Sequence, residues 1–393
     1  MLKTAHTLYE DLVHWRRDFH MHPELGFTET RTARIVADEL EKMGYRVRRG
    51  VGKTGVVADI GDEGGPTIAI RADMDALPIL ETDDREYASL IPGVMHACGH
   101  DSHTSMALGA AAILAREKFP GRVRFLFQPS EETADDEGLS GAPRMIEDGA
   151  LDGVDMVIAQ HVGPYAPVGT ISISSGPASG GVDSWFGKIF GVGGHGAHPD
   201  TVIDPFYILA HVIMGLNAIV SRRLEPFAPA VVSIGTIHGG AAQNVIPDTV
   251  EITGTLRYTD TDVHRQIKDE MRRVLEISRN LGGDYELRFE DGGGPMVNDE
   301  AASALLRAVG VDLLGEGNVQ PLRQTLGAED FGAFTGRVPG AMFVLGTRIE
   351  GDERTIHHPR FDIDERAMPI GAAMLVEAAL RFLRGEQAAD ENR

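Results

Sequence analysis

The chain has 393 residues, of which 42% are hydrophobic and 24% charged, a composition ordinary for a soluble globular protein with one large domain or two. Its 37 lysines and arginines against 59 aspartates and glutamates give a formal net charge of -22, which argues against nucleic acid or an anionic membrane surface as a partner. The single cysteine, Cys98, excludes an internal disulfide, which suits a reducing compartment.

The chain has no segment that approaches the roughly 18 apolar residues of a membrane span. Residues 1–19 are charged throughout and lack the apolar core of an export signal. We therefore expect a cytoplasmic protein that does not bind membranes. In so acidic a chain, an anionic substrate would need a local cationic clamp.

The first part of the chain shows the pattern of an α/β domain. Apolar residues recur at helical spacing from Leu8 to Phe19 and again from Ile35 to Met43, which predicts two opening helices. An alanine-rich helical stretch follows at 104–119. Short apolar runs that predict strands lie at residues 54–60, 66–72, 122–127 and 155–160. This alternation predicts an α/β domain with a mostly parallel sheet.

The pattern changes after residues 172–181, which are rich in serine and glycine and are typical of a linker. Strand and helix signals then follow in the order β-α-β-β-α-β of a ferredoxin-like unit, at residues 185–192, 204–222, 230–237, 249–258, 261–282 and 285–290. Residues 289–295 predict a return linker. Helix and strand signals resume at residues 301–314, 341–346 and 371–385.

We therefore predict a catalytic α/β domain that is interrupted by an inserted α+β domain. The catalytic domain is expected to consist of residues 1–181 and 294–393, and the insert of residues 182–293. The insert is expected to act as a lid.

Polar side chains follow the predicted strands at the edge where open parallel sheets form their sites. They are Asp73 and Asp75, Glu131 and Glu132, His161, and, after a short loop, His357 and His358. The run MHACGHDSH at 95–103 leads into the alanine-rich helix and so brings Cys98 and His100 to the same edge. It also contains His96, Asp101 and His103.

Taken singly, each of these residues is typical of a turn or a solvated face. Together, a thiolate, imidazoles and carboxylates match the ligands of zinc, manganese, cobalt or nickel. More ligands are present than one tetrahedral ion takes, so the sequence predicts two divalent metal ions in a hydrolytic centre. The residue types alone do not choose between Glu131 and Glu132, or between His357 and His358.

These motifs, in this order, resemble those of the metal-dependent aminoacylase and carboxypeptidase family. The resemblance is to the branch of hippurate hydrolases, auxin-conjugate amidohydrolases and N-acetyl-diaminopimelate deacetylases, and it covers essentially the whole chain. The motifs are RRDFHMHPELGFTE (16–29), RADMDALPI (71–79), MHACGHDSH (95–103), QPSEE (128–132), GGHGAHPD (193–200), NVIPD (244–248), GTLR (254–257), GAEDFG (327–332) and HHPRFD (357–362). Such a resemblance implies a two-metal peptidase-like catalytic domain.

The resemblance also implies the roles of the site residues. The thiolate of Cys98 would bridge the two metals, and the remaining ligand positions would be filled by His100, Glu132, His161 and His357. Glu131 would be the general base. Asp75 would orient an imidazole ligand, whereas Asp73 stands where other branches carry a histidine ligand and is not expected to bind metal. His96 and His103 are expected to be loop or supporting residues.

In the insert, the resemblance implies that His195 reaches the active site of a neighbouring subunit and supports the developing oxyanion. Asn244 and Arg257 would hold the free carboxylate of the substrate, with Arg257 as the bidentate clamp. His198 is expected to be structural. The chain is accordingly expected to form a homodimer or homotetramer through the insert.

The activity that the resemblance implies is hydrolysis of an N-acyl amino acid to a carboxylic acid and a free amino acid. A water activated by the metals would lose its proton to Glu131, which would return it to the leaving nitrogen. A metallo-carboxypeptidase or dipeptidase acting on short peptides is the nearest alternative. The acyl group is not specified by any motif.

Two alternatives belong to other classes. In a metal-free thiol hydrolase, Cys98 would be the nucleophile and a nearby histidine its base, but Glu132, His161 and His357 would then be unexplained. A catalytically silent metal-binding or ligand-binding protein would be expected to have lost the base, and Glu131 is present.

Overall fold

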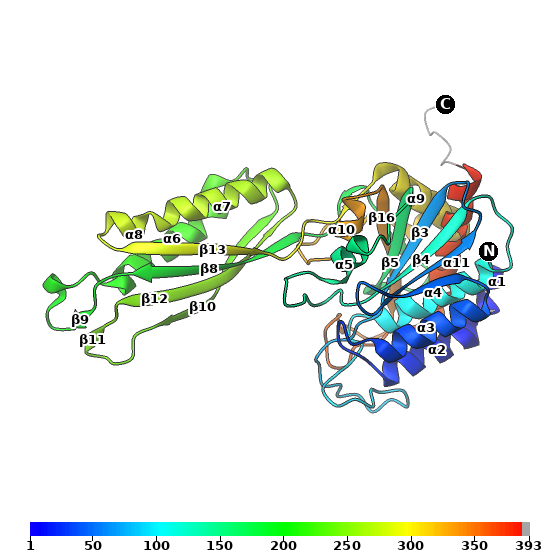
Figure 1. Cartoon of the computed structure of the whole chain (residues 1–393), viewed down its shortest axis with the longest axis horizontal. Coiled ribbons are helices and arrows are strands. Elements are labelled where there is room, and N and C mark those ends of the chain that lie inside the picture. Colours follow the sequence, from blue (N-terminus) through cyan, green and yellow to red (C-terminus); the bar gives the residue numbers. More distant parts are fainter. Residues whose placement is uncertain (387–393) are drawn as a thin grey trace. The chain divides into compact units, whose positions relative to one another are not determined.

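The computed structural model describes residues 1–386, which form two compact units (Figure 1). Unit 1 contains Met1–Ala178, Val297–Arg323 and the described residues from Asp330 onward. Unit 2 contains Ser179–Met296 and the short segment Gln324–Glu329. The predicted insert, 182–293, thus lies inside unit 2, whereas nothing in the sequence pattern indicated that 324–329 would return to it.

Unit 1 is built on an eight-stranded mixed sheet with the order β1-β2-β4-β3-β5-β16-β6-β15. The strands are β1 (Arg46–Val51), β2 (Gly55–Gly61), β3 (Thr67–Asp73), β4 (Arg122–Gln128), β5 (Met156–Pro167), β6 (Ile171–Ser172), β15 (Val319–Gln320) and β16 (Gly340–Arg348). The central strands β4, β3, β5 and β16 run parallel to one another. Every residue of β3 is buried, as expected for a strand that is covered on both faces. The predicted α/β domain is confirmed.

The first predicted strand differs from the prediction in its direction. β2 is antiparallel to both β1 and β4. Only the short segment 62–66 connects β2 to β3, and a parallel arrangement needs a crossover of a dozen or more residues. β1 was not predicted because half of its residues are arginines and most are exposed at the sheet edge, so they leave no apolar pattern.

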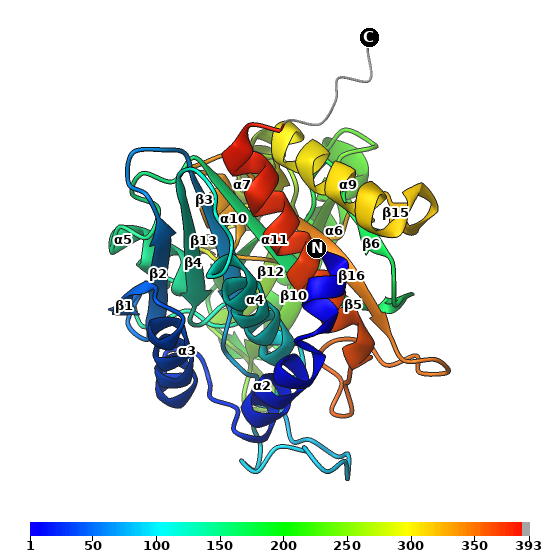
Figure 2. The ribbon, with the colours of Figure 1, turned by 90° about the vertical axis from the view of Figure 1, so that its right-hand side faces the viewer.

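Helices cover both faces of this sheet (Figures 1 and 2). α4, which is entirely buried, packs on β3 between α2, α3 and α11, while α9 packs on β16. α5 and α10 lie on the opposite face and contact β4 and β16. The helices of unit 1 are α1 (Leu2–His6), α2 (Tyr9–Met21), α3 (Thr30–Lys42), α4 (His100–Leu114), α5 (Gly141–Glu147), α9 (Glu300–Leu314), α10 (Gly332–Thr335) and α11 (Met368–Arg384).

Unit 2 is a four-stranded antiparallel sheet in the order β10-β12-β8-β13, with helices packed against it. Its chain order, β8-α6-β10-β12-α7-β13, is the predicted β-α-β-β-α-β arrangement, so the predicted fold class is confirmed. The elements are β8 (Gly181–Phe190), α6 (Pro205–Arg223), β10 (Ala230–Gly239), β12 (Thr249–Tyr258), α7 (Thr261–Leu275), α8 (Ile277–Asn280) and β13 (Asp284–Asp291). Two short strands, β9 (Gly194–His195) and β11 (Val245–Ile246), pair beside it.

By length and composition alone, α6 could cross a membrane. It was not predicted as a membrane span because its apolar residues are not consecutive. Its buried residues recur at helical spacing and pack into the core of unit 2 around Trp185. Besides Pro205 at the start of the helix, they are Ile208, Leu209, Val212, Leu216 and Ile219. This pattern is typical of an amphipathic core helix.

Candidate metal centre

The predicted ligands gather at the carboxyl ends of the parallel strands. β3 ends at Asp73, and β4 ends at Gln128, just before the two glutamates. His161 lies within β5 and not after it, because β5 continues beyond the predicted end at 160 to Pro167. Since β3, β4 and β5 are parallel neighbours, their ends bring these side chains to one edge of the sheet.

Cys98 reaches this edge through the tight turn before α4. Gly99 has a φ of +92°, and a Cβ at this position would lie 2.4 Å from Cγ2 of Val162, so the close approach to β5 requires glycine. The Sγ of Cys98 lies 3.4 Å from Nε2 of His161. His161 donates from Nδ1 to its neighbour's carbonyl, the Val162 oxygen, at 2.8 Å, which leaves the lone pair on the Nε2 that faces the thiol.

His100, the first residue of α4, is held by Asp75. Its Nδ1 lies 3.1 Å from Oδ1 of Asp75 and 2.9 Å from the Asp75 carbonyl oxygen. Its Nε2 is buried and makes no hydrogen bond to the residues described, although Oδ2 of Asp73 lies 3.6 Å away. A buried, unpartnered imidazole nitrogen is costly unless something binds it, and a carboxylate on the other nitrogen is the usual arrangement around a metal-binding histidine.

Glu132 and His357 complete the cluster from two distant segments. The Nε2 of His357 lies 3.0 Å from Oε1 of Glu132, and the backbone N–H of Glu132 donates to Oδ2 of Asp75 at 3.0 Å. Burial alone would raise the pKa of Glu132, but the hydrogen bond to His357 lowers it below its ordinary value. His357 has a φ of +64° and donates its N–H to the carbonyl of Ala97, so its unusual backbone is fixed against the Cys98 segment.

The donor atoms fall into two groups that share one residue. Within each group, all the donor atoms lie within 4.8 Å of one another: Cys98 with His100 and His161, and Cys98 with Glu132 and His357. The sulfur, nitrogen and oxygen donors of these groups fit borderline-soft divalent ions. Burial raises the pKa of the Cys98 thiol well above its ordinary value, so a thiolate here needs cations beside it.

Glu131 lies next to this cluster, within 4.8 Å of donor atoms of His100 and Glu132. It is partly buried, on the turn that follows β4. The structure therefore brings together the five predicted ligands, the predicted base Glu131 and the predicted orienting residue Asp75.

His103 and Asp73 lie close to the cluster but are already engaged. The Nδ1 of His103 lies 2.7 Å from Oδ1 of Asp73, and its Nε2 accepts the N–H of Val162 at 3.0 Å. Burial lowers the pKa of His103 to about 4, so the ring is neutral. Asp73 also accepts from Nη1 of Arg71 at 2.6 Å. With both ring nitrogens bonded, His103 supports the fold of the site.

His96 is also buried, and neither of its ring nitrogens has a hydrogen-bond partner among the described residues. Burial lowers its pKa to about 4. His358 is partly buried, and its Nδ1 accepts the backbone N–H of Arg360 at 3.1 Å.

A buried ionic network at the start of α4 was not predicted. Asp101 accepts from Nδ1 of His20 at 2.7 Å and from Nε of Arg16 at 3.1 Å, and Arg16 also binds Asp362. This network connects α2 to the helix that begins at His100. One indication of this network was present in the sequence: its residues belong to the motifs at 16–29, 95–103 and 357–362.

In unit 2, His195 and Asn244 lie side by side. His195 pairs in register with Val245 across β9 and β11, and the Asn244 carbonyl accepts the N–H of Gly196 at 2.9 Å. Both side chains are exposed. The Nδ1 of His195 accepts a backbone N–H, that of Ala197, so its Nε2 points away from this turn.

Arg257 lies near the other end of the same sheet. It pairs with Val182 at the start of β8, whereas Thr249, which follows β11, pairs with Phe190 at the end of β8 (Figure 1). At about 3.4 Å per residue, the stretch of β12 from Thr249 to Arg257 spans roughly 27 Å. Arg257 and Asn244 of one chain are therefore too far apart to bind the same carboxylate, so the prediction that both hold it requires them to come from different chains.

The Arg257 guanidinium is half-buried, and burial lowers its pKa. It donates to the carbonyl of Leu256 at 3.1 Å, and within residues 1–386 no carboxylate forms an ion pair with it. An arginine without a carboxylate partner in so acidic a protein is available to an anionic ligand.

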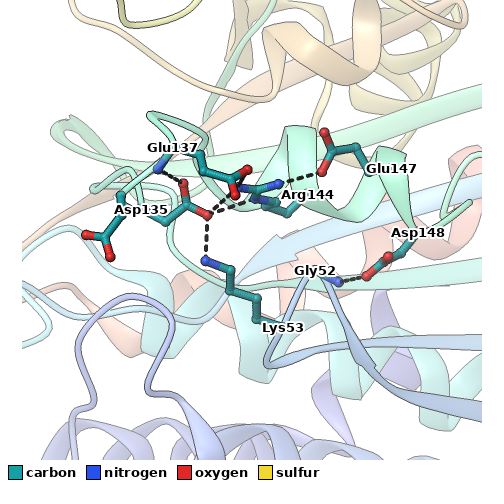
Figure 3. Close-up of a pocket in the computed structure, with 8 residues that line it drawn as sticks. Gly52, Lys53, Asp135, Glu137, Arg144, Glu147 and Asp148 are labelled. Atoms are coloured by element: carbon teal, nitrogen blue, oxygen red, sulfur yellow. Dashed lines mark hydrogen bonds and ion pairs between the residues drawn. The ribbon is translucent and has the colours of Figure 1, made fainter.

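A separate cavity of about 380 Å³ adjoins the segment after Glu132 (Figure 3). Its charges pair among themselves: Asp135 holds Nζ of Lys53 at 2.5 Å, and Arg144 reaches Asp135, Glu137 and Glu147. None of its lining residues belongs to the metal cluster. These ion pairs fix the segment to the turn between β1 and β2.

The sequence model of peptidase family M20/M25/M40 matches residues 69–381. The N-acetyl-L-cysteine deacetylase of Bacillus subtilis strain 168 is 41% identical over 384 residues, which are 96% of this chain and 89% of that protein. Thermostable carboxypeptidase 2 of Saccharolobus solfataricus is 39% identical over 380 residues, 94% of this chain and 95% of that protein. The solved structure of the YxeP protein of Bacillus subtilis, a dinuclear metal binding peptidase from family M20, has a TM-score of 0.84 and 35% identity, covering 96% of this chain and 99% of that one.

Proposed function

The chain belongs to the peptidase family M20/M25/M40, and from this we propose that it is a two-metal amidohydrolase that cleaves N-acyl amino acids into a carboxylic acid and a free amino acid. The observation that carries the proposal is the pair of three-donor groups that share Cys98. The bare Nε2 of His100, held in place by Asp75, supports a ligand role for this residue. Cys98, His100, His161, Glu132 and His357 would hold the two ions.

Two divalent ions held there would supply Lewis-acid polarisation of the scissile carbonyl and of the attacking water. Glu131 would take the proton from that water and return it to the leaving nitrogen, which makes the amine a good leaving group. Asp75 would fix the His100 ring and, through the Glu132 N–H, the turn that carries both glutamates. Cys98 and His100 are buried, which strengthens the electrostatic interactions on their side of the cluster, whereas His357 is exposed and opens the other side to solvent.

A metallo-carboxypeptidase is the second candidate, because the carboxypeptidase relative is nearly as similar as the deacetylase relative. Both activities require an amide bond next to a free α-carboxylate. They differ in the acyl side, which is a simple acyl group in one case and an aminoacyl group in the other. Parallel assays of an N-acetyl amino acid, an N-benzoyl amino acid and a dipeptide on protein supplied with Zn²⁺ or Mn²⁺ would separate the two.

The Arg257 guanidinium, which has no carboxylate partner within residues 1–386, predicts that the carboxylate of the substrate is recognised. Arg257→Lys keeps the positive charge but loses the planar fork that binds a carboxylate bidentately. We expect kcat/KM on an N-acyl amino acid to fall about tenfold or more, which corresponds to the roughly 1.5–3 kcal/mol of a hydrogen bond to a charged group. The matched control is the corresponding C-terminal amide, whose low rate should barely change. An equal fall in kcat/KM on both substrates would show that Arg257 does not bind the substrate carboxylate.

His195 and Asn244 are proposed to act on the site of a second subunit. Their exposed position at the far end of the sheet from Arg257 supports this, since they cannot share a carboxylate with Arg257 of their own chain. The assembly would then be a dimer or a larger oligomer through unit 2. Each active site would contain residues of two chains.

Metal binding should protect Cys98 from alkylation. A thiolate that bridges two cations is neither protonated nor free to react. We expect iodoacetamide to label Cys98 at least about tenfold more slowly in the metal-loaded protein than after chelation with EDTA, with activity lost in parallel. Labelling in guanidinium provides the control for full reactivity. Equal labelling in both states, together with full activity in EDTA, would support the thiol-hydrolase alternative.

A further inference from the structure

The turn that carries Glu131 and Glu132 has an unfavourable backbone. Ser130, just before Glu131, has a φ of +44° although it is not glycine. Such a conformation costs roughly 1–2 kcal/mol for an L-residue and persists only where the surroundings fix it. The turn is held on one side by Asp75, which accepts the N–H of Glu132 at 3.0 Å. Something must also hold the side that precedes Glu131.

Glu29 holds that side. Its Oε1 accepts the backbone N–H of Ser130 at 2.8 Å and that of Phe27 at 3.1 Å, and its Oε2 accepts from the hydroxyl of Thr54 at 2.5 Å. Glu29 has no exposed surface. Its carboxylate thus joins the start of α3, the turn between β1 and β2, and the turn after β4.

The segment around Glu29 is shaped to receive this turn. A Cβ on Gly26 would lie 2.3 Å from Oγ of Ser130 and 2.5 Å from Oγ1 of Thr133, so only glycine permits the contact. Phe27 has a φ of +59°, which turns its N–H toward the Glu29 carboxylate. Lys53, next to Thr54, lies over the Phe27 ring and binds Asp135 beyond the turn.

We propose that Glu29 is a positioning residue for hydrolysis: by accepting the Ser130 N–H it fixes the turn that sets the direction of Glu131 and Glu132. The proposal rests on the roles proposed above for these two glutamates. Glu29 itself touches neither substrate nor metal. Its effect passes through one backbone hydrogen bond adjacent to the base.

The cost of keeping a carboxylate at this position supports a functional role. Burial, and then Asp75, raise the pKa of Glu29 to about 7, although its hydrogen bonds act in the opposite direction. Because the pKa of Glu29 is higher in the folded protein than its ordinary value of 4.5, the protonated carboxyl contributes to the stability of the fold. This contribution is fully present below about pH 4.5 and is lost as the pH rises through about 7. A neutral glutamine would escape this loss, so Glu29→Gln should be the more stable protein at pH 8.

The test compares three variants at Glu29 in the metal-loaded protein. Glutamine keeps an acceptor oxygen for the Ser130 and Phe27 N–H groups, so Glu29→Gln should retain kcat and metal affinity within about threefold. Glu29→Ala removes the acceptor, and Glu29→Asp keeps the charge but is too short to reach. Both should lower kcat and metal affinity about ten- to hundredfold, as loss of an outer-shell partner does, with KM little changed. Glu29→Asp serves as the readout if Glu29→Ala does not fold.

The matched control is Thr54→Val, which removes only the hydroxyl donor and should leave kcat unchanged. Rates are normalised to folded protein, and metal affinity is measured by calorimetry. Full kcat in Glu29→Asp or Glu29→Ala, or an equal loss in Glu29→Gln, would overturn the proposal. The rate of each variant is compared with that of the wild type on the same substrate, which can be any amide that the wild type hydrolyses. A wild type that is inactive on N-acyl amino acids would therefore contradict the proposed function, but the comparison at Glu29 could still be made on another amide.

Discussion

Glu131→Gln should lower kcat about 10²- to 10⁴-fold while both metal ions remain bound. Glutamine has nearly the same shape as glutamate but cannot take a proton from water, so the loss is that of a positioned general base. Glu131 lies beside the cluster, and each of the two groups that share Cys98 is complete without it. Metal analysis of the purified variant, together with single-turnover rates, would measure the two properties separately.

The neighbouring residue provides the matched comparison. Glu132→Gln changes the same functional group one position away, but Glu132 contacts His357 and belongs to a donor group with Cys98. We therefore expect this variant to lose metal as well as activity, and added metal to restore part of the rate. Equal metal depletion in the two variants would show that the division of roles between the adjacent glutamates is wrong.

His100→Ala and His103→Ala should fail in opposite ways, although both residues lie in the first turn of α4. His100 has a bare Nε2, so its loss removes a ligand, and metal affinity should fall by more than the roughly 10- to 100-fold that loss of an outer-shell partner costs. His103 uses both nitrogens within the protein, on Asp73 and Val162. Its loss leaves a buried carboxylate oxygen and an N–H unpaired, and the free energy of unfolding should fall by about 1–3 kcal/mol.

Denaturant unfolding of the metal-free proteins and calorimetric metal titration would distinguish these two outcomes. In the metal-free state, His100→Ala should be destabilised less than His103→Ala. It loses hydrogen bonds at one nitrogen only, Nδ1, to the carboxylate and carbonyl of Asp75, and a 3.6 Å contact of Nε2 with Asp73, whereas His103→Ala loses hydrogen bonds at both nitrogens. His103→Ala should still bind two ions per chain. If His103→Ala lost metal while His100→Ala retained it, His103 and not His100 would be the metal ligand in this helix.

The two glutamates and the two histidines illustrate one feature of the site. Adjacent or nearly adjacent residues of the same type are predicted to have different roles because their contacts with distant segments differ. Glu132 contacts His357, and His103 contacts Val162. The same substitution at two neighbouring positions therefore compares their tertiary contacts, because the local backbone is nearly the same for both.

The sequence by itself determined the elements and the residue types of the site. Helices and strands have local periodicity, which is why β3, β4 and the ferredoxin-like order of unit 2 were predicted correctly. The placing of the ligands at strand ends was also predictable, because the carboxyl ends of parallel strands share one edge of the sheet. Cys98 was identifiable as a candidate ligand from the imidazoles around it in the sequence.

Tertiary structure alone decided strand direction and the partner of each polar atom. β2 runs antiparallel because its connection to β3 is short, and β1 is a charged edge strand without an apolar pattern. Arg257 and Asn244 are 13 positions apart in the sequence, but Arg257 pairs with the start of β8, whereas Asn244 lies in the connection that leads to Thr249, which pairs with the end of β8. The distinction between the bare nitrogen of His100 and the bonded nitrogens of His103 depends on Asp75, Asp73 and Val162. A hydrogen bond between residues far apart in the chain leaves no periodic trace in either segment, so only the folded chain shows which polar atoms remain free to bind an ion.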